Sequence, residues 1–125
     1  DMTPKERNEV WKKLEKQYRP YISTEGMPFL EDGRRWQYQM HIYETPFYYI
    51  DYCLAQTAAF GFLLASLQDY DGAFEKYMNL MKQGGEQYFD KLLEEANIPS
   101  PFKEGSLKEL SEKLESLLCD LKYKM

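Results

Sequence analysis

The chain has 125 residues and a formal net charge of −5, with 16 Lys and Arg interspersed among 21 Asp and Glu. A nucleic-acid surface needs a clustered basic patch, so this charge pattern argues against nucleic acid as a partner. The length suits one modest core, and we expect a single helical domain over residues 1–125. Eleven tyrosines are many for such a chain, and their apolar rings with polar tips suit a cleft wall or an interface.

The N-terminal segment predicts an amphipathic helix over residues 4–18. Thr3 and Glu6 have the spacing of a capping box, and Pro4 suits the first helical position. Apolar residues then recur at helical spacing, opposite a solvated face of Lys and Glu, and Pro20 ends the pattern. The apolar positions are Val10, Trp11, Leu14 and Tyr18.

Residues 19–40 lose the helical period and predict an irregular loop or a short extended pair, with a turn at Asp32-Gly33. A long irregular stretch in a helical chain usually has a functional or interface reason. The stretch either lines the entrance of a cleft or docks on a neighbour outside this chain. Arg34 and Arg35 could pair with a substrate carboxylate above Trp36, or they are simply solvated.

A central helix is predicted from Thr45-Pro46 to Leu67, because threonine caps free backbone donors and proline suits the first position. Beyond Ala58 it is apolar on every side, which predicts burial all round. Its apolar run over residues 54–65 is shorter than the ~20 residues that span a bilayer, so no membrane is expected.

The start of this helix carries a polar, aromatic face. Tyr48, Tyr49, Tyr52 and Gln56 fall within roughly a 100° arc of a helix. Phenolic hydroxyls donate hydrogen bonds while uncharged, and His41, just outside the helix, could join them. The alternative is that these side chains are core packing with satisfied hydroxyls.

The rest of the chain predicts three more helices, so the expected fold is all-α, a compact bundle of about five helices with one irregular loop or extended pair. Asp69 can cap a helix that runs to about Gln83 with four side chains on its inner face, and Gly84-Gly85 ends it. A short helix over residues 86–96 and a proline-rich connector over 98–102 follow. The inner-face residues are Phe74, Tyr77, Met78 and Met81 in the first helix and Tyr88, Phe89, Leu92 and Leu93 in the second.

The last predicted helix begins at a second capping box, Ser106 to Glu109, and carries a stripe of leucines that we expect to pack within the bundle. Cys53 and Cys119 lack CxxC spacing and predict free thiols in a reducing compartment. The charged N-terminal residues have no apolar signal core, which favours the cytoplasm.

The string WQYQMHIYETPFYYIDYCLAQTAA, residues 36–59, resembles the C-terminal part of oligoendopeptidase F in the thimet oligopeptidase family of zinc metallopeptidases. The resemblance continues through Tyr77-Met78-Asn79-Leu80, Gly84-Gly85 and residues 91–96, so it covers most of the chain. It implies hydrolysis of internal bonds in short peptides.

In that family zinc sits on an HExxH helix, whose glutamate acts as general base on a metal-bound water. This chain has one histidine and no HExxH, so we expect none of its own residues to be a metal ligand. It is either a piece of a larger enzyme whose zinc ligands lie outside it or a relative without the metal half, and we favour the piece. By that resemblance His41 and Tyr52 donate hydrogen bonds to the substrate carbonyl and its oxyanion, with Tyr48 or Tyr49 as companion. Gln56, which shares their arc, is a further candidate for substrate contact.

Two hypotheses follow. In the first the chain is the C-terminal fragment of a larger peptidase catalytic domain, inactive alone, whose partners are an oligopeptide substrate and the missing N-terminal HExxH part. It then exposes an apolar surface where that part docks. In the second it is a non-catalytic helical module that binds a peptide or protein at its tyrosines. A parent chain several times longer would favour the first.

Overall fold

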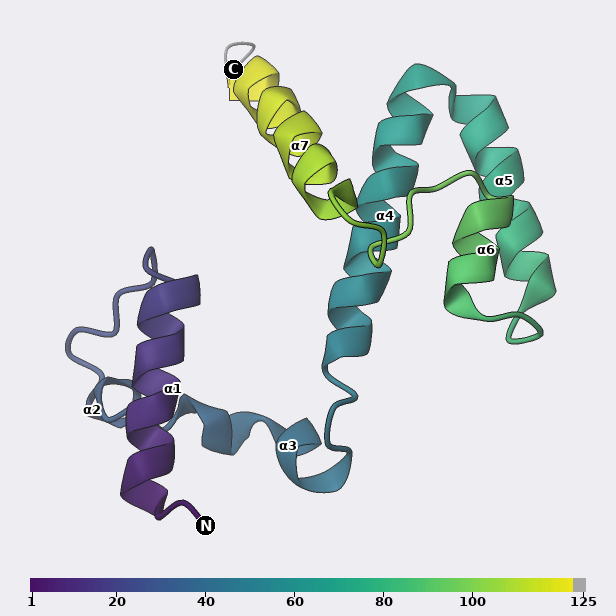
Figure 1. Cartoon of the computed structure of the whole chain (residues 1–125). Helices are drawn as coiled ribbons and strands as arrows, with labels where there is room; N and C mark the ends of the chain where they lie inside the picture. The colour runs from purple at the N-terminus through teal and green to yellow at the C-terminus, as the bar shows by residue number, and fades with distance from the viewer. Residues whose placement is uncertain (123–125) are drawn as a thin grey trace. The chain divides into compact units, whose positions relative to one another are not determined.

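A computed structural model describes residues 1–122, and these fold as two compact units, residues 1–49 and 50–122 (Figure 1). Helix is the dominant structure and no strand occurs in the described residues, so the predicted all-α class is confirmed. The elements are α1 (Pro4–Tyr18), α2 (Pro28–Glu31), a 3-10 helix η1 (Arg35–Tyr38), α3 (Met40–Glu44), α4 (Ile50–Gln68), α5 (Tyr70–Gln83), α6 (Phe89–Glu95) and α7 (Ser106–Lys122).

The first unit is built on α1, whose predicted bounds and capping box are confirmed. The Glu6 backbone N–H donates to Thr3 Oγ1, and the Thr3 backbone N–H donates to Glu6 Oε2 at 2.6 Å. These bonds favour the charged carboxylate and hold the pKa of Glu6 below its usual value, so their stabilisation is present at neutral pH and is lost as acid protonates the group.

The stretch between α1 and α3 is short helix and turn, so the extended pair predicted there is wrong. Pro28 takes the first position of α2, where its missing N–H costs nothing. Gly33 has φ +71° and lies so close to the Asn8 carbonyl and the Lys12 side chain that a Cβ would overlap both. The Trp36 indole N–H on η1 donates to Asn8 Oδ1 at 2.9 Å, which ties this stretch to α1.

The central helix begins at Ile50 and not at Thr45-Pro46. Thr45 ends α3 instead, since its backbone N–H donates to the His41 carbonyl at 3.1 Å. A residue before proline is disfavoured in the helical region, which makes Thr45 a stop and not a start. Phe47 then has φ +71°, which no right-handed helix contains. The four residues before Ile50 are therefore a turn.

In the second unit, α5 folds back along α4, α6 packs on α5 and α7 packs on α4 (Figure 1). The core consists of Leu93, Ala96 and Ile98, with Phe62 of α4 and Leu80 of α5 packed against it. The predicted extent of α5, its Asp69 cap and its Gly84 end are confirmed. The Ile98 side chain lies over Gly61 of α4, where a Cβ would come within 2.6 Å of Ile98 Cγ2.

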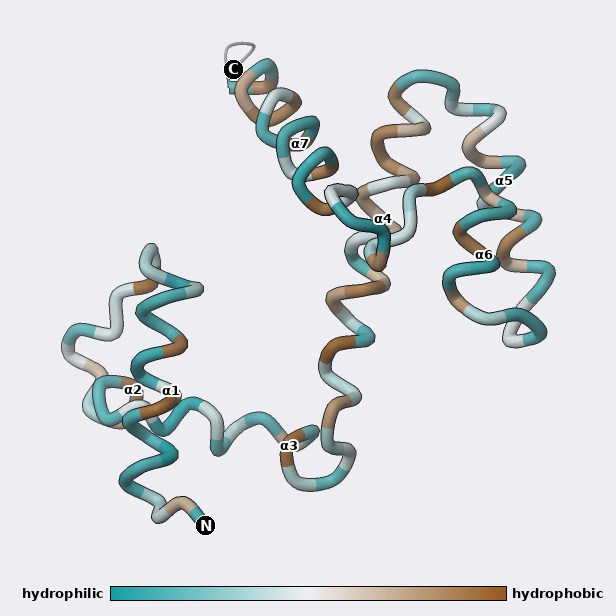
Figure 2. Tube along the Cα trace, viewed as in Figure 1, coloured by the Kyte–Doolittle hydropathy of each residue, from teal (hydrophilic) through white to brown (hydrophobic). Residues whose placement is uncertain are grey.

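Much of the predicted core is uncovered in this chain, and those predictions are wrong for the chain by itself. Gly61 is the only buried residue of α4, although the helix is mostly apolar along its length (Figure 2). The predicted inner face of α5 is exposed as well, and so is Tyr88 before α6. Within the second unit, α5, α7 and the core around Leu93 of α6 cover only part of α4. The exposed side chains include Phe60, Leu63, Leu67, Phe74, Tyr77, Met78 and Met81.

The second capping box is also wrong, because Ser106 is the first residue of α7 and not its cap. The Ser106 hydroxyl donates to the Ser100 carbonyl at 2.7 Å, while the Glu109 carboxylate accepts from Lys113 Nζ. Three leucines of the stripe are partly buried and three are exposed, so α7 packs through part of its apolar face only. The partly buried leucines are Leu110, Leu114 and Leu117, and the exposed ones are Leu107, Leu118 and Leu121.

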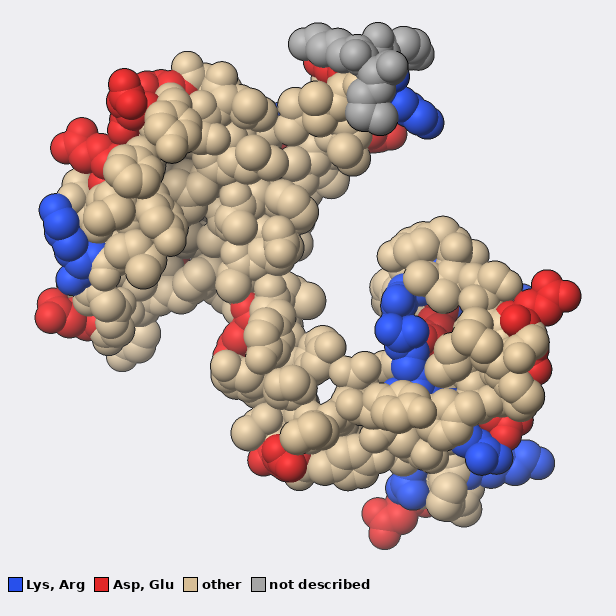
Figure 3. All heavy atoms as spheres, turned by 180° about the vertical axis from the view of Figure 1, so that it is seen from behind, with Lys and Arg blue, Asp and Glu red and all other residues tan. Residues whose placement is uncertain are grey.

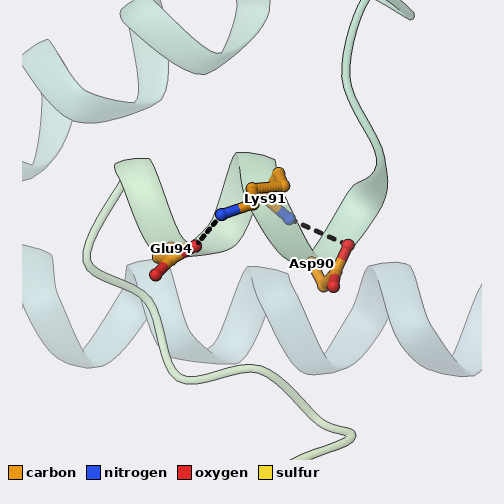
Figure 4. Close-up of polar contacts among 3 residues, drawn as sticks. All are labelled: Asp90, Lys91 and Glu94. Carbon is orange, nitrogen blue, oxygen red and sulfur yellow. Dashed lines mark hydrogen bonds and ion pairs between the residues drawn. The ribbon is translucent and has the colours of Figure 1, made fainter.

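Helix α6 is shorter than predicted and carries a local ion pair on its solvent face (Figure 4). Lys91 Nζ lies 2.8 Å from Glu94 Oε2, and the Lys91 backbone N–H donates to Asp90 Oδ1 at 3.0 Å. The Glu94 hydrogen bond raises the pKa of Lys91, but an exposed pair of this kind adds little to stability. It marks the outer side of the helix that buries Leu93.

At 19 residues α4 is long and apolar enough to cross a membrane on length and composition alone, so the argument from a dozen-residue apolar run does not hold for the whole helix. The core helix of a soluble protein meets the same test. α4 packs against α5 and α7 and approaches Ile98 closely at Gly61, but among the described residues none of its apolar window apart from Gly61 is buried.

We predict that Gly61→Ala lowers the free energy of unfolding by about 1–3 kcal/mol, because the new methyl group overlaps the Ile98 side chain. Urea denaturation measures the change. Gly85→Ala is the matched control: nothing lies within 4 Å of its Cβ position, so it should be neutral or slightly stabilising.

In the double variant Gly61→Ala/Ile98→Ala, the free energy of unfolding should fall by less than the sum of the decreases in the two single variants. Removing the Ile98 branches makes room for the new methyl group. If Gly61→Ala were as harmless as the control, the contact between α4 and the connector would not be tight.

Candidate functional site

Three of the four predicted catalytic residues lie together in the first unit and form what we call the His41 cluster: His41, Tyr48 and Tyr49. His41 is on α3, and the two tyrosines follow in the turn before α4. The His41 ring stacks on Tyr48 at a centroid distance of 5.8 Å and meets Tyr49 edge to face at 4.9 Å. The turn closes with a hydrogen bond from the Tyr48 backbone N–H to the Thr45 carbonyl, at 3.2 Å.

The cluster is accessible at the surface of its unit. Tyr48 and Tyr49 are 48% and 49% exposed, and His41 is half-buried. Their place in a turn means that the predicted 100° arc of one helix does not describe them; their contacts with His41 bring them together instead. The cluster combines two phenols and an imidazole, which can all donate hydrogen bonds to a carbonyl oxygen.

Tyr52 and Gln56 lie on the first turns of α4, in the second unit. They are four residues apart and so share one face of that helix. Tyr52 is 53% exposed and Gln56 is exposed. Tyr52 and Gln56 therefore lie on one helical face, as the predicted arc requires. Their side chains reach solvent at the N-terminal end of α4.

The two arginines predicted to bind a substrate carboxylate each lie near a carboxylate of this chain. Arg34 Nη2 is 2.6 Å from Asp32 Oδ2, and Arg35 Nε is 3.7 Å from Glu15 Oε1. Trp36 packs against Arg7, whose guanidinium carbon lies 5.5 Å from the ring centroid. Exposed ion pairs are weak, so substrate binding by Arg34 and Arg35 stays a prediction.

Arg34 also borders an open pocket of about 450 Å³ between α1 and the residues around η1. Polar side chains predominate in its lining, among them Asn8, Glu9 and Gln37. A pocket of this kind could admit a polar chain end, but it contains no residue of the His41 cluster.

Phe47 is a residue that sequence reasoning did not single out. It stands in the turn between Thr45 and Tyr48, has φ +71° and is 94% exposed. Neither its conformation nor its exposure has a signal in the sequence, because Pro46-Phe47 also fits the start of a helix.

The described residues contain no group of three or more His, Cys, Asp or Glu side chains placed to hold a metal ion. Cys53 and Cys119 are both free thiols, as predicted, and both are exposed. The structure therefore offers hydrogen-bond donors and aromatic surface at the His41 cluster and at the start of α4.

Two solved structures match the chain over 94% of its length, each at 42% identity and a TM-score of 0.87. One is of a protein assigned as oligoendopeptidase F, and the other is of PZ peptidase A with an inhibitor. The chain spans about a fifth of each, since 21% of either chain is covered. No protein-family model and no curated protein matches the chain.

These matches define the chain first as a helical segment that shares its fold with about a fifth of two peptidase structures. More specifically, the resemblance to oligoendopeptidase F that residues 36–59 carry is confirmed, and it extends over nearly the whole chain.

Proposed function

We propose that this chain is the C-terminal part of a zinc-dependent oligoendopeptidase that hydrolyses internal bonds of short peptides. In that protein His41, Tyr52 and one or both of Tyr48 and Tyr49 donate hydrogen bonds to the substrate carbonyl and to the oxyanion that develops from it. The observation that carries the proposal is 42% identity over 94% of the chain to oligoendopeptidase F. The contact of His41 with two of those tyrosines supports it.

The accessible surface supports a partner for this segment. Two compact bodies with the masses of the two units would expose roughly 8,400 Å² together by the usual scaling with mass. The chain exposes 10438 Å². In the second unit charged side chains lie mainly at the edges of the face in view and leave a broad uncharged area between them (Figure 3). The missing part of the peptidase is the proposed cover for the apolar faces of α4 and α5.

The residues of this chain do not fit a zinc site, because it has one histidine and no suitable group of ligands among its described residues. We therefore assign the ligands to the remainder of the protein. Zinc, when bound there, supplies the activated water. The part left to this chain is binding and orientation of the substrate.

Neutral donors suit this part. In hydrolysis of a peptide bond the carbonyl oxygen gains negative charge as water attacks, and donors already aimed at it stabilise the transition state more than the substrate. The stacking of His41 on Tyr48 and its edge contact with Tyr49 orient the rings before substrate arrives. Tyr52 contributes from the start of α4, and Gln56, Arg34 and Arg35 are the proposed further substrate contacts.

We predict that Tyr52→Phe in the longer protein lowers kcat on the order of 100- to 1,000-fold with zinc content unchanged, because one oxyanion donor is lost. A quenched fluorescent peptide measures turnover, and atomic absorption measures zinc. Tyr88→Phe is the control, since it removes the hydroxyl of a tyrosine that is 84% exposed and outside the proposed site. Unchanged turnover in Tyr52→Phe would remove this residue from the mechanism.

A second pair of variants separates the two candidate companions. Tyr48→Phe and Tyr49→Phe each keep the ring that contacts His41 and remove only the hydroxyl. We expect the functional companion to lose kcat by at least about tenfold, and the other to stay close to the parent. Circular dichroism checks that both fold. If neither loses activity, the His41 cluster does not act on the oxyanion.

A third prediction concerns the chain of 125 residues by itself. We expect it to cleave no peptide and to bind zinc with no defined stoichiometry, because the ligands and the general base lie elsewhere. It should also bind the dye ANS, given its exposed apolar side chains. Hydrolysis by the purified chain that is abolished by a chelator would contradict the assignment.

The alternative function is a non-catalytic module that binds a peptide or protein. It would be supported if the chain bound peptides tightly alone and if the native polypeptide proved no longer than this segment.

We propose the cytoplasm as the location, a proposal that rests on the two free thiols.

A further inference from the structure

Phe47, in the turn before α4, combines a positive φ with an almost fully exposed aromatic ring. Its φ of +71° lies in the left-handed region, which a bulky residue with a Cβ rarely adopts. Its ring is 94% exposed, so the conformation is not repaid by burial within this chain. Such conformations persist where the surroundings impose them, and they gather at active sites and ligand clamps.

The surroundings that impose it are the two ends of the turn. Before Phe47, the Pro46 ring fixes its own φ. After it, the Tyr48 backbone N–H is bonded to the Thr45 carbonyl, and the Tyr48 and Tyr49 rings lie against His41. Between these two fixed sides Phe47 takes the left-handed conformation, and its exposed ring belongs to the residue directly before Tyr48 of the His41 cluster.

From this geometry we propose that Phe47 is a specificity-determining residue: its exposed ring contacts a large apolar side chain of the bound peptide. The inference rests on the proposed peptidase function and names the substrate class of the same site. A peptide whose carbonyl meets the His41 cluster has neighbouring side chains within reach of the residue next to Tyr48. An aromatic ring there offers apolar area and edge or face contacts to an aromatic or aliphatic side chain.

The test compares two peptides that differ only in bearing phenylalanine or alanine beside the cleaved bond. In the longer protein, Phe47→Ala and Phe47→Gly should each lower the ratio of kcat/KM for the phenylalanine peptide to that for the alanine peptide by about tenfold or more. Phe47→Gly should also keep or raise Tm, because glycine takes the positive φ without steric cost. Tyr21→Ala, which removes another exposed ring of the first unit, is the control and should leave the ratio unchanged.

The outcomes are distinguishable. If the parent hydrolyses both peptides and the ratio is unchanged in the variants, this inference is overturned and the proposed function stands. If kcat/KM falls equally for both peptides and Phe47→Gly lowers Tm, the Phe47 ring packs on the rest of the protein, and the inference is likewise overturned. If the parent hydrolyses neither peptide, the proposed function fails first, and this inference fails with it.

Discussion

The second unit depends on the close approach of the residues after α6 to the middle of α4. Gly61 has no Cβ, so the Ile98 side chain can lie directly on the helix backbone. This contact holds the connector against α4, and Leu93 and Ala96 complete the core beneath it. A larger residue at Gly61 would displace Ile98, and the apolar side chains that meet there would lose their common contact. The position of α6 and the start of α7 follow from this one constraint.

What the contact does not provide is cover for the rest of α4. A helix that is apolar on all sides is stable in water only when neighbours surround it, and here α5 and α7 reach part of its surface. The same holds for α5, whose methionine and aromatic face is open. A segment that matches about a fifth of larger peptidase structures would have such faces if its remaining neighbours belonged to the other four fifths. The exposed surface and the proposed function therefore have one physical explanation.

The candidate site depends on a different kind of constraint, a short turn. Thr45 ends α3, Phe47 takes a left-handed conformation and α4 starts at Ile50. This order places Tyr48 and Tyr49 against His41, where a continuous helix from Pro46 would have carried them along its face. The residue types of the site were readable from the sequence and by resemblance, but their arrangement was not. The conformation of Phe47 in particular has no signal in the sequence, because it depends on the two ends of the turn.

By itself the sequence determined the class of fold, the bounds of α1 and α5, the Asp69 and Gly84 helix ends and the free cysteines, since periodicity, caps and glycine conformations act over a few residues. Only the tertiary structure decided where α4 begins, that Ser106 is inside α7, and which apolar residues are covered. These depend on competition between alternatives: Thr45 can cap one helix or end another, and an apolar face is buried only if a neighbour reaches it. The cover of an apolar face is decided by contacts between segments distant in the chain. The choices at Thr45 and Ser106 are decided by nearby hydrogen bonds, between which the residue types alone do not discriminate.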